Sequence, residues 1–187
     1  MKRYKFLKLK RKKIVSAYNK NFKWEIGKWY KTDEKLSMCS NGFHCSKKPL
    51  DALGYISGEI LAVVEVRGKY LKQSDKQCWQ EMKIEKAYKW TKKDSIALAI
   101  YSAELVLKNY EKEYPDDKRP REAIEAAKKV LEKDNKKNRS AARSAESAAR
   151  SAAWSAARSA ESAAWSAAIK NINKWIINHI NNLEEIK

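Results

Sequence analysis

The chain has 187 residues, with 41 Lys and Arg against 23 Asp and Glu, and a formal net charge of +18. This length accommodates one ordinary domain, or a small domain with an appendage. Its three cysteines do not make a disulfide framework, and no apolar run reaches the length of a membrane-spanning helix. We therefore expect a protein of a reducing cytoplasm, with neither a signal peptide nor a membrane segment.

The positive charge is concentrated at the N-terminus. Residues 1–31 carry twelve Lys and Arg and one acidic residue, Glu25. Such a block predicts a polyanionic partner, either nucleic acid or an acidic protein face, and a surface that serves only solubility is the alternative. The residues expected to bind are Lys8, Lys10, Arg11, Lys12, Lys13, Lys20, Lys23 and Lys28. Aromatic residues are interleaved with them, and we expect at least half of these aromatics to lie in the core.

Short strands are predicted throughout the first half, because apolar residues alternate with lysines or form short β-branched runs. The expected strands are 3–10, 13–18, short segments within 22–32, 59–66 and 78–90. Gly68 is expected to turn the chain between the last two, and the last should place Met82, Ile84 and Tyr88 on one face. Pro49 is suited to the first turn of a short helix within 46–58.

The hydrophobic period changes at Thr91. Thr91 and Asp94 have the spacing of a capping box, and apolar residues at helical spacing follow as far as Tyr114. Pro115 should end this helix. Asp116 or Asp117 can cap a second helix that carries Pro120 in its first turn, and residues 134–138 are the expected interruption after it.

Residues 140–169 are a duplicated unit of 15 residues, SAARSAESAARSAAW followed by SAARSAESAAWSAAI. Fifteen residues make close to four helical turns, the tract contains no glycine, and alanine is the best helix former, so we expect a helix and not a flexible linker. Its apolar stripe should comprise Trp154, Trp165, Ile169, Ile172, Ile176, Ile180 and Leu183. Three arginines on the same side, Arg143, Arg150 and Arg158, form a secondary basic face.

A helix continuing from this repeat to the last residue would be about 70 Å long, more than a small domain can bury. We therefore expect a homodimer through the C-terminal helix, with a helical hairpin within one chain as the alternative. The expected fold class is α+β. It has a basic β-rich domain with one short helix (1–90), two helices packing on the sheet (91–138) and a long Ala/Ser/Trp repeat helix (139–187).

The stretch MCSNGFHCSKKPLDALGY (38–55) comes closest to a chemical motif. A zinc site of three cysteines and His44 is conceivable but poorly spaced, and we interpret Cys39, Cys45 and Cys78 as structural thiols, with no metal and no cofactor. His44 is either a site residue or a histidine hydrogen-bonded to backbone beside a turn. Signatures of hydrolases, phosphate-binding loops and dinucleotide-binding loops are absent.

Residues 4–90 resemble an uncharacterised domain family of bacteriophages and prophages. The resemblance is carried by the pattern C..GFH.C..PLD.L.Y, present here as CSNGFHCSKKPLDALGY, together with WEIGKWY (24–30) and VEVRG (64–68). Such proteins often carry Ala/Ser/Trp-rich helical repeats at the C-terminus, as this chain does. The family carries no established activity, so it implies no catalytic residue. It implies a location in the cytoplasm of a bacterial host.

A small, strongly basic phage protein without a cofactor suggests a non-enzymatic inhibitor of a host defence nuclease. We expect an anti-CRISPR role, in which the basic surface contacts an RNA-guided effector, its guide RNA or its target DNA. The partner is then the nuclease or the nuclease–guide complex, with nucleic acid taking part. The alternatives are a phage nucleic-acid-binding or scaffolding protein and, third, an enzyme with a site near His44.

Overall fold

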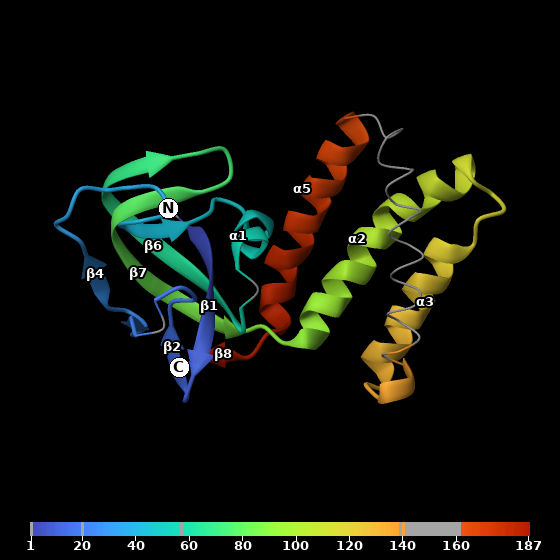
Figure 1. Ribbon diagram of the computed structural model, residues 1–187, viewed down its shortest axis with the longest axis horizontal. Coiled ribbons are helices and arrows are strands. Elements are labelled where there is room, and N and C mark those ends of the chain that lie inside the picture. The colour runs from blue at the N-terminus through green and yellow to red at the C-terminus, as the bar shows by residue number, and fades with distance from the viewer. Residues whose placement is uncertain (1, 20, 57, 139, 141–161) are drawn as a thin grey trace. The chain divides into compact units, whose positions relative to one another are not determined.

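The computed structural model describes residues 2–19, 21–56, 58–138, 140 and 162–187, and nothing is described of the side chains of 162–165. The chain divides into two compact units, each with its own core (Figure 1). Unit 1 comprises Met1–Thr91 and Ile176–Lys187, and unit 2 comprises Lys92–Trp175. The α+β class expected from the sequence is confirmed, with an antiparallel curled sheet followed by helices.

Unit 1 is built on two long antiparallel strands, β6 (Ile60–Lys72) and β7 (Gln77–Lys89). On the far side of β6 lies β1 (Arg3–Lys10), followed by β2 (Lys13–Val15) and β3 (Lys23–Trp24). The other edge of β7 pairs with three short strands, β4 (Trp29–Lys31), β5 (Phe43–Cys45) and β8 (Glu185–Ile186). The strand segments expected from the sequence are therefore confirmed, and β5 and β8 are additional to them.

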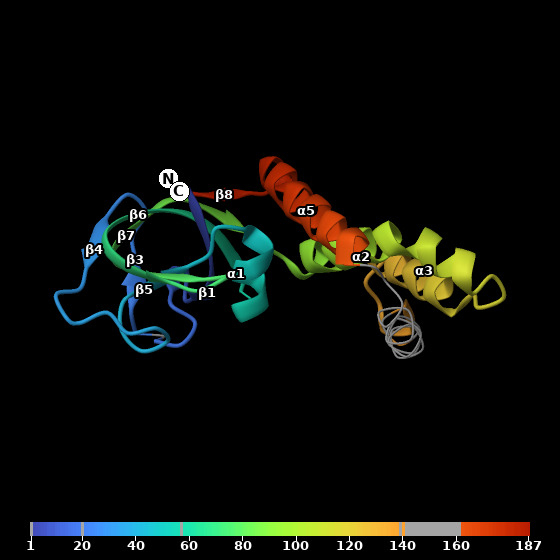
Figure 2. The same cartoon turned by 90° about the horizontal axis from the view of Figure 1, so that it is seen from above.

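The sheet closes on itself through a bridge between Tyr4 and Ser46. Tyr4 and Ser46 exchange two backbone hydrogen bonds of 2.9 Å, so β1, β6, β7 and β5 form a ring. The curl of the long strands is visible in Figure 2. Side chains directed into the ring form the core of unit 1, which includes Leu7, Ile60 and Met82 at 0% exposure.

A cluster of aromatic rings extends this core. Phe22 and Trp24 pack edge-on at 5.0 Å between ring centroids, and both pack against Tyr30 and Phe43. The helix α1 (Pro49–Tyr55) has its proline in the first turn, as expected. Of the four aromatics interleaved with the basic residues, Tyr18, Phe22, Trp24 and Trp29, two thus belong to the packed interior, Phe22 and Trp24.

Two expectations about β6 and β7 are wrong, both because of β-bulges. Gly68 does not turn the chain: it lies within β6 with φ +83°, where the register shifts between Arg67 and Tyr70. The turn is made by Gln73–Lys76, closed by a hydrogen bond of 2.8 Å from the Gln73 N–H to the Lys76 carbonyl. A second shift, opposite Val63/Val64, places Ala87 instead of Tyr88 in the core cluster with Met82 and Ile84.

Unit 2 contains the antiparallel pair α2 (Lys92–Glu113) and α3 (Arg119–Glu132), whose apolar stripes meet at Ile100, Leu107 and Ile124. At the turn, the Asp117 carboxylate accepts hydrogen bonds from the Tyr110 hydroxyl at 2.6 Å and from the Arg119 guanidinium at 2.6 and 2.8 Å. These bonds, the Arg119 contacts above all, hold the pKa of Asp117 far below its ordinary value. The helix α3 ends at Glu132 and residues 133–135 are not helical, so the expected interruption is present.

The C-terminal segment differs from the expected continuous helix. The helix α5 (Ser162–His179) ends at His179, a short 3-10 turn covers Ile180–Asn182, and β8 then pairs with Ala87 and Tyr88 of β7. Asparagines 181 and 182 favour a turn over a helix, and the half-buried Ile186 packs on the core of unit 1. Residues 176–187 therefore belong to unit 1, and Ile180 and Leu183 do not extend the helical stripe.

The expected stripe is observed in the described part of α5. Ile172 and Ile176 are buried and Ile169 is half-buried. Trp154 and the arginines Arg143, Arg150 and Arg158 lie outside the described residues, and nothing is described of the Trp165 side chain. The dimer through this segment thus stays a prediction. In the described part of the chain, no helix has both the length and the apolar character required to span a membrane.

Candidate functional site

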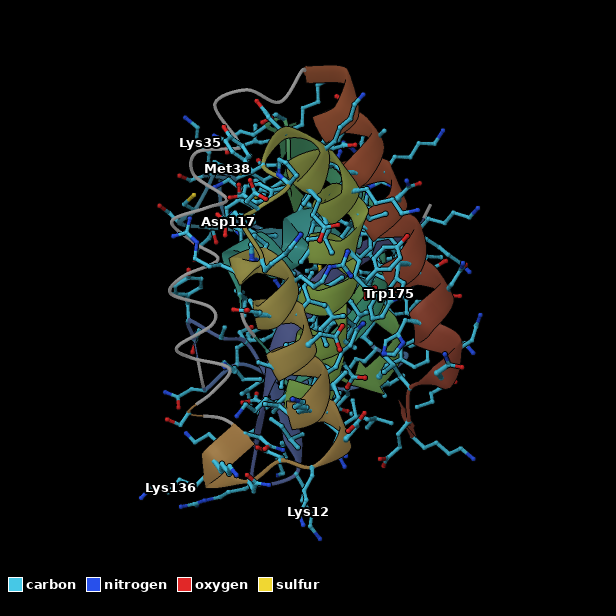
Figure 3. All side chains as sticks on the ribbon, turned by 90° about the vertical axis from the view of Figure 1, so that its right-hand side faces the viewer. Lys12, Lys35, Met38, Asp117, Lys136 and Trp175 are labelled. Atoms are coloured by element: carbon cyan, nitrogen blue, oxygen red, sulfur yellow. The ribbon has the colours of Figure 1, made fainter. Side chains whose placement is uncertain are left out.

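The strongest candidate site is the tip of the β1–β2 hairpin, which we call the basic hairpin and define as Lys10–Lys13. Lys10 pairs with Lys13 in the antiparallel register, and Arg11 and Lys12 form a turn of two residues between them. All four residues are exposed. Lys12 points away from the strands of unit 1 at the lower end of Figure 3.

The turn holds two bulky cations in a backbone conformation that suits other residues better. Arg11 has φ +48° and Lys12 has φ +64°, the left-handed region that a two-residue hairpin turn of this kind requires at both central positions. Asn-Gly is the favoured pair there, and each non-glycine residue costs about 1–2 kcal/mol in this region. Local strain of this kind is concentrated at functional sites in proteins. The sequence keeps charge at the tip at the expense of turn stability.

The basic hairpin also lacks neutralising partners. None of its four cations forms an ion pair with a carboxylate among the described residues. Strand β1 and strand β2 fix the four side chains at one end of unit 1 because both strands continue into the core through Leu7 and Ile14. An exposed, uncompensated group of four positive charges can bind phosphates or carboxylates without giving up an internal contact.

The other expected binding residues divide into three kinds. Lys8 lies 3.6 Å from the Glu59 carboxylate. Lys28 lies 2.8 Å from Glu25, which raises the lysine's pKa. Lys23 is exposed on β3, where it pairs with Val15, and Lys20 lies outside the described residues. The structure therefore brings four of the eight together as a free group and leaves Lys8 and Lys28 paired with carboxylates.

One aromatic residue of the N-terminal block is fully available for contact. Tyr18 is 86% exposed, whereas Trp24 is buried and Phe22 packs on the core. Tyr18 follows the end of β2 that is remote from the turn, so it is not part of the basic hairpin.

The segment 38–55 has a structural role in this fold. Gly42 has φ +113°, and a Cβ at this position would lie 2.4 Å from the Cys78 sulfur. His44 accepts a hydrogen bond of 2.9 Å at Nε2 from the backbone N–H of Cys39, which itself has φ +70°. Burial, followed by the charges of Lys5 and Lys76, lowers the pKa of His44, which keeps the ring neutral as an acceptor. The backbone-bonded alternative for His44 is thus observed.

Cys39, Cys45 and Cys78 do not come together as metal ligands in the part of the chain that the structure describes. Cys45 and Cys78 are buried, and Cys39 is exposed with its sulfur 2.9 Å from the Lys76 amine. Within the residues that the structure describes, no group of three or more His, Cys, Asp or Glu side chains could hold a metal ion.

Two cations that share a face of β1, the buried Arg3 and the half-buried Lys5, were not expected from the sequence. Arg3 is 5% exposed and donates a hydrogen bond of 2.6 Å to the Gln77 amide oxygen. Lys5 donates one of 2.6 Å to the His44 carbonyl, and burial lowers its pKa to about 8. Their alternation with Leu7 along β1 was the available signal, because i, i+2 and i+4 share a face of a strand.

The surface of unit 2 also has a hollow. A cavity of about 380 Å³ lies along α3, between Arg121, Glu125 and Asn138. Its lining mixes both signs of charge, and Asn138 lies at the end of a described range of the chain. The cavity carries no signal for a ligand class.

Comparison with protein-family models divides the chain where the structure does. Residues 2–94 match a family described as "Domain of unknown function (DUF7666)", and residues 86–177 match one described as "Imm-5 like putative immunity protein". No curated protein and no solved structure gives a significant match. The helical half is thus similar to immunity proteins, and the basic β-rich half is similar to a domain whose description states no function.

Proposed function

We propose that this chain is a non-enzymatic binding inhibitor of a nuclease, and that the basic hairpin is its contact to the nucleic acid that the nuclease holds. The observation that carries the proposal is the free group of four cations on a strained turn. The similarity of residues 86–177 to immunity proteins supports an inhibitory role and a protein partner.

The chemistry favours phosphates as the ligands of the basic hairpin. Nuclease surfaces that bind nucleic acid are themselves positive, so a basic inhibitor is repelled by an empty binding cleft and attracted by a filled one. Lysine and arginine contacts to phosphates give affinity without sequence preference. The narrower form of the proposal is a host defence nuclease of the RNA-guided class, whose guide RNA and displaced DNA strand present phosphates continuously.

The first experiment is a pull-down of the tagged full chain from bacteria that express defence nucleases, with and without prior digestion of nucleic acid. We expect a nuclease to be captured together with nucleic acid, and digestion to release it. Capture that is unchanged by digestion would contradict the phosphate contact. Tight binding to naked duplex DNA, with no nuclease captured, would instead support the nucleic-acid-binding or scaffolding alternative.

A charge-matched pair of variants assigns the contact to the hairpin. The test variant replaces Lys10, Arg11, Lys12 and Lys13 with Gln. The control replaces four exposed lysines of unit 2 that form no ion pair with a described residue, Lys108, Lys112, Lys133 and Lys137. Both variants lose the same charge. If the basic hairpin makes the contact, the hairpin variant should no longer capture the nuclease, whereas the unit 2 control should still capture it.

A further inference from the structure

The opposite end of unit 1 carries a second basic feature that the proposed function does not use. A cavity of about 40 Å³ lies at the turn of the β6–β7 hairpin, and three lysines line it, Lys47, Lys72 and Lys76. A water-sized sphere occupies about 10–15 Å³ by this measure, so the cavity has room for roughly three of them, about the size of one phosphoryl group.

One of the three cations is held in place by its surroundings. The Lys76 amine donates a hydrogen bond of 2.9 Å to the Cys39 sulfur and lies 4.8 Å from the centre of the Tyr55 ring. Fixing a cation before the ligand arrives reduces the entropy lost on binding. Lys72 and Lys47 are exposed and form no ion pair with a described carboxylate.

The charge of the cavity suits a doubly charged anion. One carboxylate, Asp75, also lines it, and its Oδ2 accepts a hydrogen bond of 2.5 Å from the Tyr55 hydroxyl. A second carboxylate nearby, Asp51 of α1, interacts electrostatically with both Lys48 and Asp75. Three ammonium groups and the Asp75 carboxylate leave two positive charges in the lining, close to the charge of a phosphate monoester of about −1.5 to −2.

An aromatic platform adjoins the cavity on the same strands. The rings of Tyr70 and Trp79 stack at 4.3 Å with an angle of 15°, and Tyr70 is 47% exposed. Tyr70 pairs with Trp79 and Lys72 with Gln77, so the platform is the next cross-strand pair on the same face. Two residues of a strand span about 6.6 Å, comparable to the reach from a nucleotide's phosphate to its base.

We propose that this end of the β6–β7 hairpin binds the terminal phosphate of a single-stranded nucleic acid, with the terminal base stacked on Tyr70. The lysines that line the cavity take the monoester, and the face of the Tyr70 ring turned away from Trp79 takes the base. An internal phosphodiester carries half the charge and is the poorer ligand. The site lies in unit 1 and does not depend on the basic hairpin or on the proposed inhibition.

The test uses the full chain and a short oligothymidylate in three forms, with a 5′-phosphate, with a 3′-phosphate and with neither, each labelled in the middle. Fluorescence anisotropy reports affinity. We expect one of the two phosphorylated forms to bind about tenfold more tightly than the unphosphorylated strand. Equal affinity for all three forms, or no binding of any form, would overturn the proposal. If an acidic peptide binds and none of the three strands does, the surface is assigned to a protein partner instead.

Variants separate the two halves of the site. Lys72→Gln should abolish the preference for the phosphorylated strand, whereas Lys69→Gln, an exposed lysine on the same strand outside the cavity lining, should keep it. Tyr70→Leu should weaken the phosphorylated and unphosphorylated strands alike, by about tenfold, through lost stacking. Thermal unfolding monitored by circular dichroism checks that the variants fold.

The basic-hairpin variant distinguishes this site from the proposed function. With Lys10, Arg11, Lys12 and Lys13 replaced by Gln, the ratio of affinities for phosphorylated and unphosphorylated strands should be unchanged. If that ratio disappears in the hairpin variant and survives in Lys72→Gln, the terminal phosphate binds elsewhere and the inference is wrong.

Discussion

At the scale of single residues, backbone strain identifies which positions serve the fold and which serve binding. Gly42 and Cys39 adopt positive φ beside buried groups, where the chain must turn tightly against Cys78. Arg11 and Lys12 adopt it at an exposed tip, where nothing in the packing requires their side chains. Only the second kind of strain needs a functional explanation.

The first prediction concerns the turn of the basic hairpin. Arg11→Asn with Lys12→Gly should raise the free energy of unfolding by about 1 kcal/mol, because Asn-Gly fits the turn without the left-handed penalty. Lys10→Gln with Lys13→Gln removes the same charge from strand positions and should leave stability within about 0.5 kcal/mol. Urea unfolding measures both. A loss of stability in the Asn-Gly variant would show that the turn is not strained.

The second prediction tests the structural role of the motif segment. Gly42→Ala should destabilise the protein by about 2–4 kcal/mol, since it adds backbone strain and a clash with the Cys78 sulfur. Gly54→Ala is the matched control, because Gly54 lies in α1 and a Cβ added there would have no atom within 4 Å. This control should stabilise the protein by about 0.5–1 kcal/mol. Equal effects of the two substitutions in thermal unfolding would contradict a structural role for Gly42.

The third prediction follows from the lowered pKa of the half-buried Lys5. Burial lowers its pKa to about 8 in the folded chain, below the ordinary 10.5 of the unfolded chain, so the folded state binds fewer protons between these values. The free energy of unfolding should therefore rise through Lys5 from about pH 8 to about pH 10.5, by up to about 3 kcal/mol. Below pH 8 the amine is charged in both states, and Lys5 should cause no change with pH.

Lys5→Met isolates this contribution. Burial raises the pKa of Cys45 to about 12, which lowers stability as pH rises above about 9, and the charge of Lys5 opposes that rise. The two proteins are therefore compared from pH 7 to 9, below the range in which Cys45 contributes. The unfolding free energy of the natural chain should rise relative to that of the variant above pH 8. A difference that is flat from pH 7 to 9 would contradict the lowered pKa of Lys5.

At the scale of elements, hydrophobic periodicity predicted where the strands and helices lie. The prediction failed at β-bulges and at the C-terminal end of the chain. The strand pattern located β1, β6 and β7, and the change of period at Thr91 and the prolines located α2 and α3. The N-cap of α3 is Lys118, not the expected Asp116 or Asp117. A bulge is one extra residue in a strand and leaves the composition unchanged, so the places of Gly68 and Tyr88 could not be read from alternation. Asn181 and Asn182 were a local signal for the end of α5, but the pairing of β8 with β7 is a tertiary contact that no local pattern contains.

The candidate site was predictable only in part for the same reason. The basic block of residues 1–31 was visible as composition, but its division into free and paired cations depends on the positions of Glu25 and Glu59 in space. Lys8 and Lys28 could not be separated from Lys10–Lys13 by sequence. The cavity at the turn of the β6–β7 hairpin brings Lys47 to Lys72 and Lys76 from an earlier part of the chain, and no local pattern signalled that contact.

The fourth prediction concerns β8. Ending the chain after Asn182 removes the backbone hydrogen bond of 2.9 Å from Lys89 to Glu184 and the packing of Ile186 on the core of unit 1. We expect a loss of about 2 kcal/mol in unfolding free energy and faster hydrogen exchange at the amides of residues 87–89. Unchanged exchange at these amides would show that β8 does not protect the edge of β7.

At the scale of the whole molecule, the chain joins a basic β-rich unit to a helical unit similar to immunity proteins. The boundary between the two family matches falls at the end of β7, where unit 2 begins at Lys92. The last twelve residues return to unit 1, so the helical unit is inserted between two parts of the sheet unit. Under the proposed function, the first unit supplies the charge and the second supplies the protein-binding surface.

The fifth prediction is the dimer. Because Ile172 and Ile176 are buried within one chain, a dimer should depend on the tryptophans of the repeat. Light scattering should give twice the chain mass of 21.6 kDa, and Trp154→Ala with Trp165→Ala should dissociate the dimer. Tyr18→Ala, which removes an exposed aromatic from unit 1, is the control and should leave the mass unchanged. A monomer at all concentrations of the natural chain would contradict the prediction.

The most direct test of the central claim is the salt dependence of partner binding. Affinity for the partner captured in the pull-down is measured from low to high salt for the natural chain, the basic-hairpin Gln variant and the charge-matched unit 2 control. If the four cations contact phosphates, the slope of log affinity against log salt should be steeper by about 3.6 in the natural chain and the control than in the hairpin variant. The same slope in all three proteins would contradict the claim that the basic hairpin binds the partner's nucleic acid.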